Sequence, residues 1–169
     1  MAITQWNPAT KISRGNIAVG VVPAVVDIDK PVLAELNAGI GLDCSITTMN
    51  GTSSTDSESV DWLCDPSSEQ LPGSTSHTID DLVIKTSGQA DAALITGLSI
   101  GDTVYIWRRD GIAHEDALDA GDYVWVWRVV ITSIDPLEAS NTFIGITAHI
   151  TVSGRSKTAV PVLATAPTP

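Results

Sequence analysis

The chain has 169 residues, of which 43% are hydrophobic, so it is long and apolar enough to bury the core of one domain. Its twenty Asp and Glu outnumber nine Lys and Arg, which gives a formal net charge of −11. This charge disfavours a protein that grips nucleic acid or an anionic membrane, because affinity for phosphate comes largely from basic side chains.

The N-terminal region predicts an arm followed by a bent strand. Residues 1–16 are polar and without periodicity, and they lack the basic start and apolar stretch of a signal peptide. Residues 17–28 are rich in Val and Ile but include Pro23, which has no N–H to donate, so this pattern predicts an edge or bent strand. No apolar stretch is long enough to cross a bilayer, so we expect a soluble protein without a membrane partner.

Residues 29–39 predict a short amphipathic helix. Asp29 can cap its first turn, Pro31 fits that turn, and Gly39 can end the helix in the left-handed conformation. Beyond it, residues 42–46 alternate apolar and polar side chains, which predicts a half-buried strand.

The composition then changes over residues 50–59, none of which has an apolar side chain. Such a segment cannot offset the entropy lost on ordering by burying a core. We therefore predict a long polar loop over residues 50–76, mobile in the free protein and interrupted by a short strand at 60–64.

The second half has the alternation and turn residues of a β-rich domain. Strands are predicted at 78–86, 103–109, 123–134 and 142–153, and a short helix at 87–97. We also expect a loop or a single helical turn at 110–121, a turn at 135–141 and an extended tail at 155–169. The strand at 123–134 has bulky apolar residues on both faces, which is typical of a strand near the middle of a packed sheet. In the last strand the even-numbered residues from 144 to 152 are expected to point inward.

These six or seven strands and one or two short helices predict a mainly β fold, a β-sandwich or barrel with helices on its side. We expect one body over residues 17–154, preceded by the arm at 1–16 and followed by the tail at 155–169.

No pattern in the sequence predicts a catalytic, metal or cofactor site. His77, His114 and His149 are far apart and lack the spacing of metal ligands. Asp80 and Asp81 lack the glycine turn and the set of oxygen ligands of a calcium loop. Nucleophile-elbow, P-loop and dinucleotide-binding patterns are also absent from the sequence. We therefore expect a protein that is not an enzyme and that holds no cofactor.

The two cysteines allow two interpretations. Cys44 and Cys64 have no CxxC or metal-ligand spacing, so we expect buried free thiols, as in other intracellular proteins. A disulfide between neighbouring strands is the alternative.

Aromatic and cationic side chains recur on two of the predicted strands. These residues are Trp107, Arg108, Arg109, Trp125, Trp127 and Arg128. Such a face can stack single-stranded nucleic acid, or the indoles can pack a core or an interface while the arginines pair with carboxylates. The net charge favours the second interpretation.

The order of these elements resembles that of the tail tube proteins of bacteriophages of the lambda type. The helix and the strand after it carry one part of the match, at Pro31, Ala34, Glu35, Leu36, Gly39 and Cys44. Further parts are VDWLC at 60–64, the Pro72-Gly73 turn, TVYIWRRDG at 103–111, the Ala120-Gly121 turn and DYVWVWRVVI at 122–131. The resemblance covers most of the chain.

This resemblance implies a structural protein of the virion, located in the long, non-contractile tail of a phage. It would be assembled in the cytoplasm of the bacterial host. Six copies would close into a ring, and rings would stack into a tube through which DNA passes without tight binding. Further partners would be the tape measure, terminator and tail tip proteins. The polar loop would contact the next ring through Asn50, Gly51, Thr52, Ser53, Ser54, Thr55, Asp56, Ser57, Glu58 and Ser59.

The acidity then predicts a channel wall that repels phosphate and offers DNA no site at which to stall. The candidates for that wall are Asp80, Asp81, Asp102, Glu115, Asp116, Asp119 and Asp122. Three alternatives remain open: another ring-forming tail component such as a terminator or connector, a tube protein like that of type VI secretion, and an acidic β-rich binding module.

Overall fold

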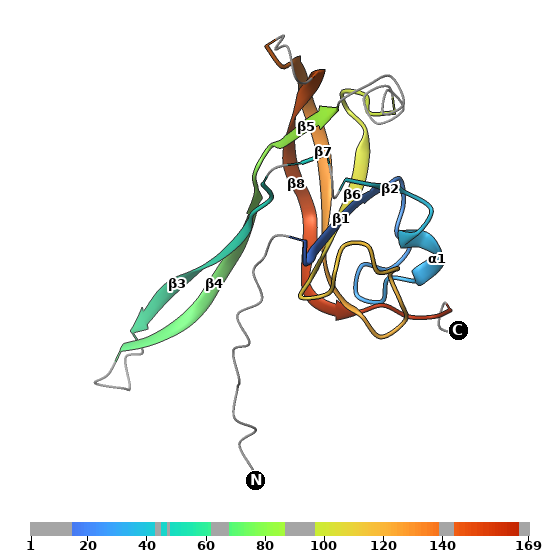
Figure 1. Cartoon of the computed structure of the whole chain (residues 1–169). Helices are drawn as coiled ribbons and strands as arrows, with labels where there is room; N and C mark the ends of the chain where they lie inside the picture. The colour runs from blue at the N-terminus through green and yellow to red at the C-terminus, as the bar shows by residue number, and fades with distance from the viewer. Residues whose placement is uncertain are drawn as a thin grey trace.

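The protein is mainly β, as predicted, and consists of a curled sheet from which a long two-stranded arm projects (Figure 1). The structure, a computed structural model, describes residues 15–42, 45–46, 48–61, 68–86, 97–138 and 144–165. The sheet contains β1 (Ile17–Val22), β2 (Ile40–Gly41), β5 (Leu82–Thr86), β6 (Thr103–Asp110), β7 (Tyr123–Pro136) and β8 (Ile144–Pro161). The arm contains β3 (Gly51–Asp61) and β4 (Ser68–Ile79), and α1 (Leu33–Leu36) is a single helical turn.

The sheet has the order β2-β1-β6-β7-β8-β5, and each neighbouring pair is antiparallel. β7 lies inside the sheet, as its apolar residues on both faces predict. β1 stops at Val22, directly before Pro23, because proline cannot continue the ladder of hydrogen bonds.

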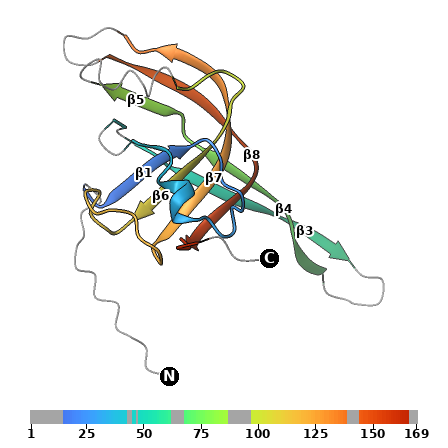
Figure 2. The same ribbon diagram turned by 90° about the vertical axis from the view of Figure 1, so that its right-hand side faces the viewer.

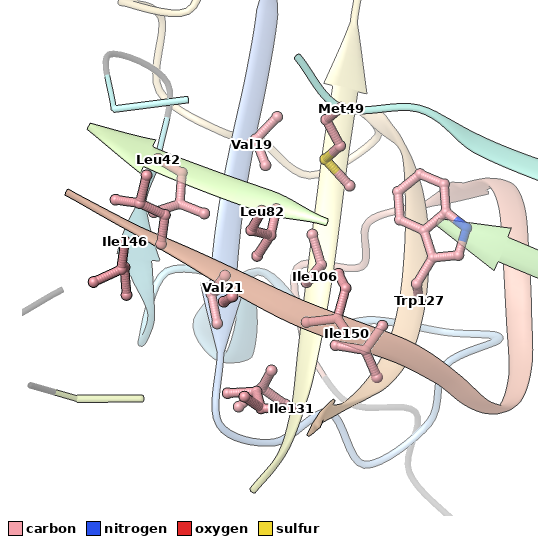
Figure 3. Packing of buried hydrophobic residues seen from close by; sticks show 14 residues of the cluster. Val19, Val21, Leu42, Met49, Leu82, Ile106, Trp127, Ile131, Ile146 and Ile150 are labelled. Atoms are coloured by element: carbon pink, nitrogen blue, oxygen red, sulfur yellow. The ribbon is translucent and has the colours of Figure 1, made fainter. Parts of the chain in front are cut away.

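Alternation along the strands divides the buried side chains into two clusters, one on each face of the sheet. Ile106 and Trp127 belong to the larger cluster, whereas their neighbours Trp107 and Val126 belong to the smaller one, which α1 covers with Leu36. The larger cluster is drawn in Figure 3. Two apolar faces explain why apolar side chains follow one another along β7 from Val124 to Ile131, a stretch in which Arg128 is the charged residue.

The sheet curls until its two ends share one core (Figure 2). Val21 of β1 and Ile84 of β5 stand near opposite ends of the strand order, yet both belong to the larger cluster. The segment after β2 connects the two ends: the Leu42 N–H donates to the Val19 carbonyl at 2.8 Å, and Ile46 forms a bridge with Ile84. Of residues 42–46, predicted as a strand, the described Ser45 lies in a turn and Ile46 forms an isolated bridge, whereas residues 43 and 44 lie outside the described residues.

The helix is shorter than predicted, and a different residue caps it. Val32 is the N-cap, and the Glu35 carboxylate accepts the Val32 N–H at 3.3 Å and the Val26 N–H at 3.2 Å. The predicted cap, Asp29, instead forms an ion pair with Lys157 of β8 at 2.5 Å. Tertiary contacts thus decide that Glu35, and not Asp29, accepts a backbone N–H at the start of the helix.

The limits of three predicted strands are also wrong. The strand predicted at 78–86 is broken at Asp80 and Asp81, so that β4 belongs to the arm and β5 to the sheet. β7 runs on through Pro136, into the first two residues of the turn predicted at 135–141, and β8 runs on through Pro161, into the predicted tail. Most of the predicted helix at 87–97 lies outside the described residues. Residues 1–14 of the predicted N-terminal arm and both cysteines lie outside them as well.

The part of the chain after β8 packs against α1. The Leu163 N–H donates to the Pro31 carbonyl at 2.9 Å, and the Leu33 N–H donates to the Leu163 carbonyl at 2.8 Å. The buried Val162 joins Leu36 in the smaller cluster. The division of the chain at residues 16 and 154 stays a prediction, to which the structure adds that β8 continues across residue 155.

Candidate assembly surfaces

The arm contributes no buried residue to either core cluster among the described side chains. In place of the irregular loop predicted for residues 50–76, β3 and β4 pair from Gly51↔Ile79 to Asp61↔Ser68, with one irregularity between Thr55 and Ser57. The loop prediction was wrong because it counted only apolar burial, whereas a backbone ladder and cross-strand threonines also order a hairpin.

Threonine pairs across the arm supply its side-chain contacts. The hydroxyls of Thr52 and Thr78 are 2.6 Å apart, and those of Thr55 and Thr75 are 2.9 Å apart. Both pairs are exposed, and β-branched residues fit a pleated strand. Of the predicted contact residues 50–59, residues 51–59 lie along β3 and Asn50 directly precedes it.

The strand that enters the arm is fixed to the sheet by Arg108. Its Nη1 donates to the Met49 carbonyl at 2.8 Å, and its Nε pairs with Asp110 at 2.7 Å. Met49 is buried in the larger cluster, and Gly51 lies so close to Trp127 that an added Cβ would stand 2.6 Å from the indole. Glycine at this position lets the arm leave the sheet directly over the ring.

The strand that leaves the arm is fixed by Asp81. The Asp80 N–H donates to the Asn50 carbonyl at 2.9 Å and closes the base of the hairpin. The Asp81 carboxylate then contacts two residues of β8. It accepts the Ile150 N–H at 3.2 Å, and its Oδ2 lies 2.6 Å from Nδ1 of His149. Residues 80 and 81 are therefore the junction between arm and sheet.

A buried arginine organises the loop that joins β6 to β7. Arg109 is 1% exposed, and its guanidinium donates to the Asp122 carboxylate at 2.9 Å. It also donates to the carbonyls of Ala113, Asp116 and Ala117 at 2.7 to 3.0 Å. These contacts hold the loop in one conformation, because a guanidinium presents its donors in a rigid fork.

Two edges of the sheet lack a full neighbour in the described part of the chain. β2 pairs with β1 only at Gly20 and Val21, and β5 pairs with β8 only as far as Ala148, which leaves the long C-terminal half of β8 paired on one side. Ile40 and Ile100 are also 43% and 66% exposed. Open edges and exposed apolar side chains are features that subunits of an assembly cover.

Comparison with known families gives one match that covers nearly the whole chain. The model of a family described as "Phage tail tube protein" matches residues 4–165. The chain belongs to the phage tail tube protein family. A comparison with curated proteins found no match.

Among solved structures, the chain is similar to a chain in the cryo-EM structure of the anti-feeding prophage baseplate, 6-fold symmetrised. The two are 12% identical, with a TM-score of 0.43 over 89% of this chain and 97% of that chain.

For this member of the tail tube family, the seven acidic candidates occupy three separate places. Asp80 and Asp81 lie at the base of the arm, and Asp102 lies before β6, where its carboxylate accepts the Ser99 N–H. The other four, Glu115, Asp116, Asp119 and Asp122, share the loop at the opposite end of β6. Asp122 is neutralised by Arg109, so the structure brings together some of the candidates and not all of them.

The tryptophans and arginines of the predicted aromatic face are divided between both faces of the sheet. Trp125 and Trp127 stack with ring centroids 5.9 Å apart beside Arg108, whereas Trp107 and Arg109 face the other way. Arg128 donates to the Ser153 carbonyl at 3.2 Å. A continuous stacking platform therefore does not form, and the interpretation as packing residues is confirmed for Trp107 and Trp127, which are buried.

The described residues contain no group of three or more His, Cys, Asp or Glu arranged to hold a metal ion. Within the same residues, no helix has the length and apolar character that crossing a membrane requires. His77 lies on the arm, His114 lies near Gly15, and His149 lies between two carboxylates. Sequence spacing gave no sign of the last cluster, because its members are 14 and 68 residues apart.

Proposed function

We propose that this chain is the tube subunit of a lambda-type, non-contractile phage tail, in which six copies form a ring and rings stack into a conduit for DNA. The observation that carries the proposal is the arm, which projects from the body and buries no core of its own (Figure 1). A two-stranded ribbon is marginal alone in water, so a surface on a neighbouring subunit would complete its burial.

In this proposal the arm contacts the next ring through residues 50–59. Its polar surface fits a contact that forms late, since exposed threonine and serine side chains keep the free subunit soluble. The unpaired edges of β2 and β8 would then serve contacts within a ring, because a ring leaves no strand edge open.

The negative charge supports the role of a conduit. Five of the acidic candidates, Asp80, Asp102, Glu115, Asp116 and Asp119, form no ion pair with the described residues, so no basic side chain in that part of the chain offsets them. Facing the channel, they would repel phosphate along its length. Lysine at these positions should permit assembly but slow DNA ejection from the virion, and unchanged ejection in every variant would contradict this part.

Negative-stain electron microscopy of the purified full chain tests the proposal. We expect hollow rings that stack into tubes, and we expect a variant whose arm is shortened to a tight turn after Asn50 to give rings that do not stack. A chain that stays a monomer at high concentration would contradict the proposal. Single rings from the unaltered chain would instead indicate a terminator.

A further inference from the structure

His149 lies where the arm joins the sheet, between two carboxylates. Its Nδ1 is 2.6 Å from Asp81, which belongs to the junction, and its Nε2 is 3.0 Å from Asp135 of β7. The imidazole therefore connects the junction, through Asp81, to the neighbouring strands β7 and β8. Its side chain is 39% exposed, so solvent protons reach it.

A bulge in β7 brings Asp135 to this position. Before the bulge, odd-numbered residues such as Trp127 and Ile131 face the larger cluster, but after the register shift between Ile131 and Ser133 the even-numbered Ile134 does so. An extra residue in one strand exchanges the two faces beyond it. Asp135 thus lies on the outer face, diagonally across from His149, instead of in the core.

Protonation decides how many of these contacts the ring can make. A neutral imidazole has one N–H, so it donates to one carboxylate and turns a lone pair toward the other, whereas an imidazolium donates to both. The hydrogen bond to Asp81, opposed by desolvation and supported by the charges of Asp81 and Asp135, raises the pKa of His149 above its usual 6.5.

The two anchors of the arm differ in this respect. Arg108 holds the entering strand through the Met49 carbonyl and stays charged at every physiological pH, whereas His149 holds the leaving strand and titrates. The other charged groups near the junction are Asp80, which is exposed, and Lys85, which pairs in register with Gly145, four residues along β8 from the imidazole. Neither contacts the ring.

We propose that His149 is a protonation-dependent latch that fixes the direction of the arm, and with it the contact between rings. The second half of this inference rests on the proposed function of the arm. Because the pKa of His149 is raised in the folded protein, the latch is fully closed below about pH 6.5 and opens as the pH rises through that raised pKa.

Nuclear magnetic resonance of the full chain under monomeric conditions tests the latch itself. We expect the backbone order parameters of the arm amides to fall with rising pH. The midpoint of this fall should equal the midpoint of the pH titration of the His149 ring signals. His149→Gln should abolish this dependence and leave the arm loose at all pH values. His77→Gln, which removes the histidine within the arm, should preserve it. An arm whose order does not change with pH in the unaltered chain, or loses its response in His77→Gln, would overturn the proposal.

Two further variants separate the latch from a general effect of charge. Asp135→Asn should lower the midpoint of His149, whereas Glu138→Gln, which removes an exposed carboxylate just after β7, should leave the midpoint in place. Equal shifts in both variants would contradict a specific contact.

Tube length against pH, measured by electron microscopy, tests the consequence for assembly. We expect tubes to shorten above the midpoint in the unaltered chain and to be insensitive to pH in His149→Gln. If the order of the arm in the monomer depends on pH but the length of the tubes does not, the link between the latch and stacking is overturned, while the tube function stands. Absence of tubes at every pH would contradict the proposed function, while the measurement on the monomer still decides the latch.

Discussion

The body and the arm of this protein are both antiparallel β-structure, but different interactions hold them. In the body, side chains are fully buried on both faces of the sheet, for example Ile106 in the larger cluster and Val124 in the smaller one. In the arm, the described side chains are mostly exposed, and a backbone ladder with hydroxyl pairs joins the two strands. The body is therefore expected to unfold cooperatively, whereas the arm can open without it.

This difference suits a subunit that has to fold before it assembles. Burial of apolar area stabilises the body independently of any partner. The arm gains little from burial in the free chain, so its order depends on the two anchors at its base and on whatever surface later covers it. Substitutions in the body, at the junction and in the arm test whether the two regions are stabilised in these different ways.

The largest effect is expected in the body, from Arg109→Ala. Removal of the guanidinium breaks the ion pair with Asp122 and the hydrogen bonds to three carbonyls, and we expect the free energy of unfolding to fall by about 3 kcal/mol in urea denaturation. Arg155→Ala, at an exposed position of β8, is the matched control and should change stability by less than about 0.5 kcal/mol. Similar losses in the two variants would show that the loop does not depend on Arg109.

An intermediate effect is expected at the junction, from Gly51→Ala. The new methyl group meets the Trp127 indole, so either the ring or the strand has to move, at a cost of about 1–3 kcal/mol. Near-ultraviolet circular dichroism should change with the indole environment, and tubes should form less readily because the arm leaves the sheet at a different angle. Ser53→Ala, two residues further into the arm, should leave both measurements as they are.

The smallest effect is expected in the arm, from Thr52→Val. This change keeps the shape of the side chain but removes its hydroxyl contact with Thr78, worth up to about 1 kcal/mol. Amide hydrogen exchange should accelerate up to about fivefold in β3 and β4, with no change in the body. Faster exchange in β6 or β7 would mean that arm and body form one cooperative unit.

Much of the body was predictable because its strands follow the simple alternation of buried and exposed residues. β6 and β7 begin where the sequence predicts, and Ile146, Ala148 and Ile150 point inward as expected. The arm was not predicted because its serine and threonine residues form no apolar core. Their cross-strand contacts depend on the register of β3 and β4, which no local sequence pattern indicates.

The candidate surfaces were predictable to a smaller extent. The sequence indicated which segment leaves the body and that the chain is acidic, but not that Arg109 neutralises Asp122 or that Asp81 and Asp135 flank His149. Contacts of this kind depend on strand order and on a bulge in β7, neither of which leaves a local pattern.

The sequence by itself thus determined the class of fold, the central strands and the overall charge, because these follow from composition and from the period of a strand. Only the tertiary structure decided the curl of the sheet, the ordered arm and the histidine at its base. These features arise from pairing between residues that are distant in sequence, and register, which one extra residue can reverse, selects the side chains that meet.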